Sequence, residues 1–122
     1  MDKSKKELFL EKCLTSNYIW NVCSKSDVYD YTDKHDCIIN CYFTNYQNSK
    51  GNTNTIYLIE RNEYVFDENF AEYRDMKTYE IIVISDSKII ANLSQYNVPR
   101  ETFFELVRKI INSQMENNDD LL

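Results

Sequence analysis

The feature that most limits the fold of this chain is a run of β-branched residues between Tyr79 and Ser85, which reads Ile-Ile-Val-Ile at its centre. A run of this length suits a strand, and its lack of alternation is typical of a strand buried on both faces. We therefore expect it to be the central strand of a sheet. Asp86 and Ser87 favour a tight turn, which predicts a hairpin into a further strand over residues 88–93.

Three earlier segments also predict strands. Residues 18–23 are aromatic and β-branched, which favours a short strand. Residues 37–44 have strand composition, and alternation would turn one set of side chains toward the core: Cys37, Ile39, Cys41 and Phe43. The single glycine of the chain, Gly51, lies in a polar stretch that predicts a hairpin into a strand over residues 55–60.

A helix is predicted near each end of the chain. Residues 4–17 place apolar side chains at helical spacing beside Lys and Glu. Near the other end, the Asn-Val-Pro sequence at 97–99 predicts a helix start. Phe103, Val107 and Ile110 then share one face of the helix that follows, so we expect this face to pack against the sheet.

The segment between the two predicted hairpins is ambiguous. Phe66, Phe70 and Tyr73 match the spacing of one helix face, whereas residues 64–66 taken alone would suit a strand. We favour a short helix near residues 68–75.

The order of these elements predicts an α+β fold. We expect an antiparallel sheet of about five strands, flanked by an N-terminal and a C-terminal helix that pack mainly on one face. A chain of 122 residues with 43% hydrophobic residues suits one core, so we predict a single domain over residues 1–115. Residues 116–122 carry three acids without apolar periodicity and are expected to form a disordered acidic tail.

The location of the protein is predicted from what its sequence lacks. No stretch approaches the roughly 20 apolar residues of a bilayer span, and charges occupy the start where a signal peptide needs an apolar run. We therefore expect a cytoplasmic protein without membrane contact. In that reducing compartment the four cysteines are expected to be free thiols, although their number would also allow two disulfides.

Residue types that bind metals gather between positions 33 and 41: Asp33, His35, Asp36, Cys37 and Cys41. On one strand, however, the Cα atoms of Cys37 and Cys41 would lie about 13 Å apart, too far to share a zinc ion or to form a disulfide. We predict no bound metal. Cys13 and Cys23 are expected to be small core residues.

The sequence shows no catalytic or cofactor-binding motif. Loops that cradle phosphates need glycines, and this chain has one. His35 is the only histidine, and its polar surroundings favour a solvated loop residue over a catalytic base. We expect neither enzymatic activity nor a cofactor. A small enzyme stays an alternative, which a deep pocket with perturbed acids around His35 would favour.

Negative charge is concentrated in two stretches that also carry tyrosines. The net charge of -6 and the lack of a basic stripe disfavour direct nucleic-acid binding. Residues 60–80 hold seven acids against three basic residues, and residues 27–36 form a second acidic stretch. Carboxylates pair with Lys and Arg, and Tyr is enriched at binding hot spots. The predicted partner-binding residues are Asp27, Tyr29, Asp30, Tyr31, Asp33, Glu63, Tyr64, Asp67, Glu68, Glu72, Tyr73 and Asp75. The alternative is that both stretches are solvated faces.

Two functions of different classes fit this profile. We favour a non-enzymatic inhibitor that blocks a basic nucleic-acid-handling protein by charge mimicry, as toxin-immunity and phage anti-defence or anti-CRISPR proteins do. A composition poor in Gly and Pro and rich in Asn, Ile and Lys is typical of the AT-rich genes of low-GC bacteria and their phages. The alternative is an acidic chaperone or adaptor that binds an extended segment, since the element order loosely resembles type III secretion chaperones. An exposed apolar groove and a stable dimer would favour the chaperone, and a monomer with a continuous acidic patch would favour the inhibitor.

Overall fold

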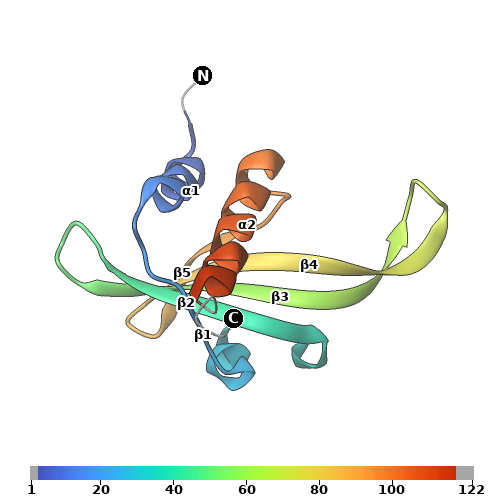
Figure 1. The fold of residues 1–122 in the computed structure, drawn as a ribbon, viewed down its shortest axis with the longest axis horizontal. Coiled ribbons are helices and arrows are strands. Elements are labelled where there is room, and N and C mark those ends of the chain that lie inside the picture. The colour runs from blue at the N-terminus through green and yellow to red at the C-terminus, as the bar shows by residue number, and fades with distance from the viewer. Residues whose placement is uncertain (1–2, 118–122) are drawn as a thin grey trace.

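The computed structural model describes residues 3–117 of the chain. The protein contains a five-stranded sheet whose strands lie side by side in the order in which they occur along the chain. Every neighbouring pair of strands is antiparallel (Figure 1). The elements are α1 (Lys5–Thr15), β1 (Asn21–Val22), the 3₁₀ helices η1 (Lys25–Tyr31) and η2 (His35–Cys37), β2 (Ile38–Gln47), β3 (Thr53–Asp67), β4 (Glu72–Ser85), β5 (Lys88–Leu93) and α2 (Arg100–Asn117). The expected α+β class, with five antiparallel strands and a helix near each end, is confirmed.

The prediction that the β-branched run forms the central strand is wrong, because the run lies in β4 and the middle strand of the sheet is β3, which pairs with β2 on one side and with β4 on the other. β4 is nevertheless buried on both faces over residues 81–84, where every side chain is at most 6% exposed, as its β-branched run predicts. Asp86 and Ser87 have φ angles of 50° and 63°, the left-handed pair that a tight hairpin turn requires. They lead into β5 over the predicted residues.

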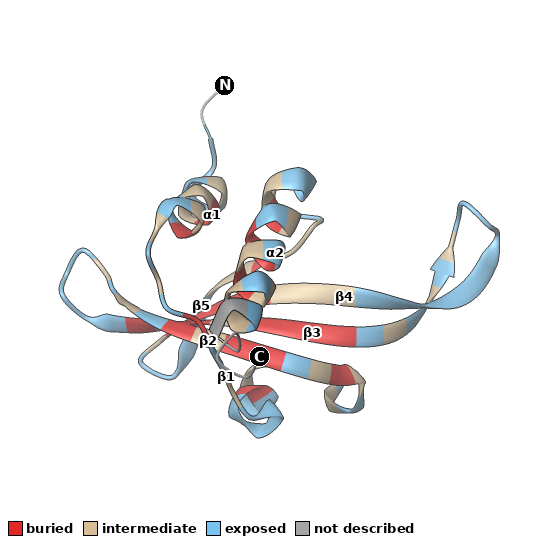
Figure 2. Cartoon of the chain, viewed as in Figure 1, coloured by how far each residue is buried: buried red, intermediate tan, exposed pale blue. Residues whose placement is uncertain are grey.

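The main core lies between the sheet and the two α-helices, which cover one face (Figure 1). It consists of Leu10, Cys13, Trp20, Tyr42, Ile56, Leu58, Ile81, Val83, Leu93, Phe103, Leu106, Val107 and Ile110. Phe103, Val107 and Ile110 are each at most 3% exposed, which confirms the predicted apolar face of the last helix. Runs of four buried residues occur at 58–61 of β3 and 81–84 of β4, whereas the outer part of the β3–β4 hairpin is exposed (Figure 2).

A second, smaller core lies on the opposite face of the sheet. It consists of Val28, Ile38, Cys41, Ile59, Ile82 and Ile84. Val28, which is fully buried, is supplied by η1. Much of the acidic stretch over residues 27–36 therefore forms 3₁₀ helices that cover this face.

The prediction of four free thiols is wrong, because Cys23 and Cys41 form a disulfide with their Cα atoms 5.5 Å apart. The pairing of β1 with β2 brings them together, and the backbone N–H of Cys23 donates to the carbonyl oxygen of Cys41 at 3.0 Å. Cys23 is thus a disulfide partner rather than a small core residue. Cys13 and Cys37 are free, and Cys13 is buried in the main core as expected.

The side-chain alternation of β2 is interrupted by a register shift between Ile38 and Asn40. Because of this shift, Ile38 and Cys41 both enter the second core, while Tyr42 enters the main core. The predicted core face consists of Cys37, Ile39, Cys41 and Phe43. That prediction is wrong, since only Cys41 of these four is buried.

The predicted start of the last helix is shifted by a few residues. Asn97 holds the preceding loop, where its side-chain oxygen accepts a hydrogen bond from the backbone N–H of Ser94 at 2.8 Å. At the other end α2 includes residues 116 and 117, where the tail is expected to begin, and 118–122 lie outside the described residues. No helix within residues 3–117 has the length and apolar character needed to cross a membrane.

Candidate interaction site

A two-stranded ribbon extends from the sheet beyond both α-helices (Figure 1). It consists of residues 62–67 of β3, a turn over 68–71 and residues 72–78 of β4, and we call it the arm. β2 pairs with β3 only as far as Arg61, and β5 pairs with β4 only from Ile81 onward. Among the described residues the arm therefore pairs only with itself, and both of its edges are open.

The arm stands where a short helix was expected near residues 68–75, and that expectation is wrong. Phe66 lies directly opposite Tyr73, with ring centroids 5.2 Å apart, so the seven-residue spacing reflects a contact across the hairpin. The Asp67 carboxylate accepts a hydrogen bond from the backbone N–H of Asn69 at 2.9 Å, and Ala71 has a φ angle of 51°. Cross-strand aromatic pairs stabilise such a hairpin, and helical periodicity cannot detect them.

Aromatic rings follow the arm but stay accessible to solvent. Their side chains are between 50% and 69% exposed: Tyr64, Phe66, Phe70 and Tyr73. The rings of Tyr64 and Tyr73 stack with centroids 5.5 Å apart. Arg74 lies 4.8 Å from the centre of the Phe70 ring and donates to the Asp67 carboxylate at 3.1 Å. The rings are thus held in place before any partner binds, which lowers the entropy cost of binding.

At the base of the arm, two acids of the 60–80 stretch serve the fold itself. Glu60 is only 4% exposed and accepts a hydrogen bond from the side-chain amide of Asn40 at 2.8 Å. Burial and a hydrogen bond with Glu60 raise the pKa of Tyr79 to about 12. Glu80 accepts from the guanidinium of Arg61 at 3.1 Å, and this arginine is itself buried. Neither carboxylate is free to meet a partner.

Glu63 is also occupied within the domain. Its carboxylate accepts from the Lys34 ammonium at 2.8 Å and from the Thr78 hydroxyl at 2.6 Å. These two hydrogen bonds hold the pKa of Glu63 below its ordinary value, with the Lys34 bond contributing most. With Asp67 bound to Arg74, four of the seven acids between positions 60 and 80 have partners inside the domain.

The acids that are available lie in the outer part of the arm. Glu68, Glu72 and Asp75 are exposed, and within the described residues none of them forms an ion pair. The negative field of this stretch therefore comes from its outer end.

The predicted binding residues of the arm are divided between its two faces, since directly opposite residues of paired strands share a face. One face carries Tyr64, Tyr73 and Asp75. The other carries Glu63, Asp67 and Glu72, and Glu68 lies in the turn.

The second acidic stretch lies in and after η1, on the face of the sheet opposite the α-helices (Figure 1). Here Asp27 accepts from the backbone N–H of Ser24 at 3.2 Å, and Tyr31 stacks on Tyr57 at 6.2 Å. Of the predicted binding residues in this stretch, Asp27, Tyr29, Asp30 and Asp33 are exposed, and Tyr31 is half-buried. Lys34 joins this stretch to the base of the arm through its bond to Glu63, but the tip of the arm extends away from η1 (Figure 1).

The grouping of metal-binding residue types between positions 33 and 41 has a structural use. His35 stacks on Tyr29 at 4.2 Å, and its Nε2 lies 2.7 Å from the carbonyl oxygen of Thr32. Because a carbonyl oxygen only accepts, Nε2 is the protonated nitrogen and donates. Cys41 belongs to the disulfide, and no group of three or more possible metal ligands occurs in the part of the chain that the structure describes.

The free thiol of Cys13 lies elsewhere, in the main core. Burial raises the pKa of this thiol to about 12, which leaves it unreactive.

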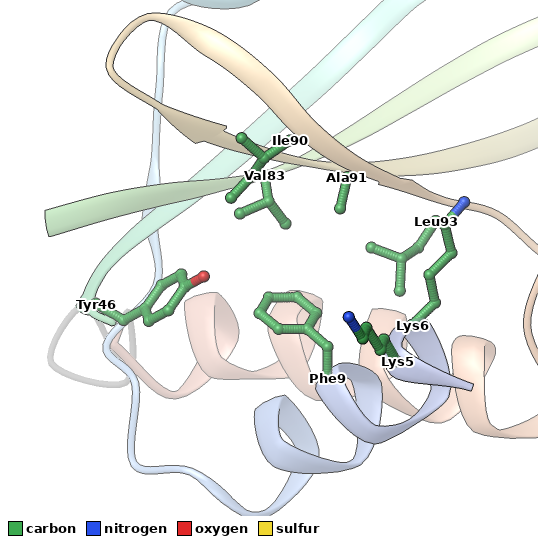
Figure 3. Close-up of a pocket in the computed structure, with 8 residues that line it drawn as sticks. All are labelled: Lys5, Lys6, Phe9, Tyr46, Val83, Ile90, Ala91 and Leu93. Atoms are coloured by element: carbon green, nitrogen blue, oxygen red, sulfur yellow. The ribbon is translucent and has the colours of Figure 1, made fainter. Parts of the chain in front are cut away.

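A groove of about 510 Å³ lies between the arm and the start of α2. Phe66, Met76 and Phe104 give it apolar walls, and Lys77 and Arg100 add positive charge. A second pocket of about 290 Å³ lies between α1 and β5, where Phe9 and Ile90 face each other across it (Figure 3). None of the predicted binding residues lines this second pocket.

Sequence reasoning missed Met76 and Lys77 on the outer edge of β4 and Phe70 at the turn. A usable signal was present, since turn-forming Asp67 and Asn69 separate two aromatic segments that can pair.

No protein-family model, curated protein or solved structure matches the chain. The function is therefore inferred from the arm and its surroundings.

Proposed function

We propose that the protein is a non-enzymatic inhibitor that binds a basic, nucleic-acid-handling protein through the arm. The observation that carries this proposal is the combination of ordered, exposed aromatic rings with three carboxylates that have no ion-pair partner within residues 3–117, those of Glu68, Glu72 and Asp75. Aromatic anchors supply binding energy, and carboxylates select a partner rich in Lys and Arg. The inhibitor belongs to the toxin-immunity or phage anti-defence type and acts in the cytoplasm, where the disulfide between Cys23 and Cys41 has to withstand reducing conditions.

The mechanism is competition for the cations that hold phosphates in the partner. Carboxylates of the outer arm attract the partner over about 10 Å at 0.1 M salt, and the aromatic rings then hold it. Charge mimicry is confined to this outer part, because the acids at the base are used by the fold. The second acidic stretch adds to the long-range field through Asp30 and Asp33.

The test uses three immobilised proteins to capture partners from the lysate of a low-GC bacterium. They are the wild type, the double reversal Glu68→Lys/Glu72→Lys, and the control Glu101→Lys/Glu105→Lys, which makes the same charge change at exposed positions of α2. We expect the wild type and the control to retain a basic nuclease or effector that the arm variant loses. Circular dichroism establishes that all three are folded: the arm variant should melt with the wild type, since exposed charges contribute little to folding, and the control slightly lower, because Glu101 lies in the first turn of α2.

The captured protein is then purified for kinetics and for its own activity. Association with the wild type should slow as salt rises, and binding should block the partner's nucleic-acid binding or cleavage. Association that is independent of salt, together with unchanged capture by the arm reversal, would overturn charge mimicry.

The groove beside the arm favours a second candidate, a chaperone or adaptor for an extended segment of another protein. Its apolar walls include Met76 and Phe104, and the β4 edge above it offers unpaired backbone groups. In this case Phe104→Asp should abolish capture while Glu68→Lys/Glu72→Lys should not. The opposite pattern favours the inhibitor.

A further inference from the structure

We propose that the open edge of β4 pairs with β4 of a second copy of this chain, so that the two sheets join into one continuous sheet with two-fold symmetry. This interface shares Asp75 and Tyr73 with the partner-binding surface proposed above, but it forms without any such partner.

The open edge has a defined length. β5 covers β4 only from Ile81 to Ser85, because the chain leaves the sheet after Leu93. Residues 72–80 of β4 are left without a neighbour on that side among the described residues. An exposed edge of this kind presents a row of unpaired N–H and C=O groups that can pair with another strand. The groove of about 510 Å³ lies beside this edge at Met76, Lys77 and Thr78.

Symmetry restricts the ways in which two copies of this edge can pair. A two-fold axis perpendicular to the sheet places one residue opposite its own copy, and its neighbours then pair in opposite order. The midpoint of residues 72–80 is Met76. A register centred on Met76 therefore uses the whole open edge of both copies.

Charge selects the same register. If the axis passed through Asp75 or Lys77, each would face its own copy, and like charges directly opposite one another are destabilising. With the axis at Met76, Asp75 of each copy faces Lys77 of the other, so two opposite-charge pairs form. The same register places Tyr73 opposite Tyr79, which is a favourable aromatic pair.

The side chains at the centre of this register are available. Met76 is 42% exposed, and Asp75 and Lys77 are exposed without an ion pair among the described residues. At the outer positions Glu72 faces Glu80 of the second copy, but the Glu80 carboxylate is already bound by Arg61 at 3.1 Å. Its repulsion of Glu72 is therefore weakened.

Pairing also resolves a weakness of the arm. A two-stranded ribbon is marginally stable in water, and joining two arms side by side makes four strands. A foreign strand would gain the same backbone hydrogen bonds, but the self-complementary charges favour a second copy. A stable dimer adds weight to the chaperone reading, yet it leaves the Glu68 side chain at the tip available for a basic partner.

The first test measures the monomer–dimer equilibrium of the full chain by analytical ultracentrifugation over a dilution series. Asp75→Lys and Lys77→Asp each place like charges opposite one another twice, so each should weaken the dimer about tenfold or more. The double variant Asp75→Lys/Lys77→Asp restores opposite charges and should restore the dimer. Glu68→Lys/Glu72→Lys should not weaken it, which separates this interface from the partner-binding surface. Circular dichroism establishes that each variant is folded.

The second test fixes the register by cross-linking in a Cys37→Ser background. Met76→Cys should form an intersubunit disulfide, since directly opposite residues have Cα atoms about 4.5–5.5 Å apart. Lys77→Cys is the control, because its two copies would lie about 8 Å apart, beyond disulfide reach. A wild type that stays monomeric throughout the series would overturn the proposal, and so would a dimer that survives both single reversals or that cross-links through Lys77→Cys instead.

Discussion

At the scale of single residues, Lys34 connects the 3₁₀ helices η1 and η2 to the base of the arm. It adopts a left-handed backbone conformation between η1 and η2, with φ of 53°, and its ammonium reaches Glu63 at 2.8 Å. The Thr78 hydroxyl donates to the same carboxylate at 2.6 Å. Both bonds are stronger with the ionised form of Glu63, so this charge helps to hold the base of the arm in place.

Replacing Lys34 should change how the fold responds to acid. The lowered pKa of Glu63 means that its carboxylate stabilises the fold above the ordinary pKa, and this contribution is lost as pH falls through the lowered value. Lys34→Gln should move the pKa of Glu63 toward its ordinary value, so the variant should lose less stability on acidification than the wild type. Carboxyl NMR titration and urea unfolding at several pH values measure the two effects. Lys25→Gln, at an exposed lysine of η1, is the control and should leave the pKa of Glu63 unchanged. An unchanged pKa of Glu63 in Lys34→Gln would contradict the expectation.

Residue types could be predicted better than residue roles. The acid and tyrosine bias of the arm is visible in the sequence, but Lys34 and Glu63 are 29 positions apart, and nothing local pairs them. The disulfide has the same origin, since Cys23 meets Cys41 only because β1 and β2 pair. Long-range pairing therefore decides which acids are free and which thiols are not.

At the scale of elements, buried segments were predictable and the solvated arm was not. The β-branched run of β4 has the continuous pattern of a strand buried on both faces, and the apolar face of α2 has the period of a helix. Neither face of the arm packs against a core, so its strands lack the alternation of apolar and polar residues that identifies a half-buried strand. Its aromatic residues then match helical spacing by coincidence.

The last helix should be indispensable for folding. Val107 is 3% exposed in the main core, and Val107→Asp places an unpaired charge there, which should cost about 3 kcal/mol or more of unfolding free energy. Val22→Asp makes the same chemical change in β1, where the side chain is 60% exposed, and should cost far less. Urea unfolding followed by circular dichroism compares them. Equal losses in the two variants would mean that the main core does not depend on α2.

At the scale of the whole molecule, the sheet is stabilised by a core on each face, and the arm lies outside both. The two cores are built from residues of the helices, η1 and the inner parts of the strands. The arm contributes no residue to either core. Folding and binding are thus assigned to separate parts of one chain, which lets the arm carry exposed rings and open edges without weakening the fold.

This separation predicts that the arm can be shortened without loss of the fold. Tyr64 and Asp75 are directly opposite in the register, so residues 65–74 can be replaced by Asn-Gly, which closes a two-residue hairpin turn between them. The melting temperature of the shortened chain should stay close to that of the wild type, because the removed side chains are not part of either core. Capture of a basic partner should be lost with Glu68, Glu72 and the aromatic rings, and the dimer should weaken because Tyr73 loses its place opposite Tyr79 of the second copy. Circular dichroism melts, lysate capture and ultracentrifugation of the same preparation test all three expectations. A shortened chain that no longer folds would show that the arm supports the core, and one that still captures the partner would move the binding surface away from the arm.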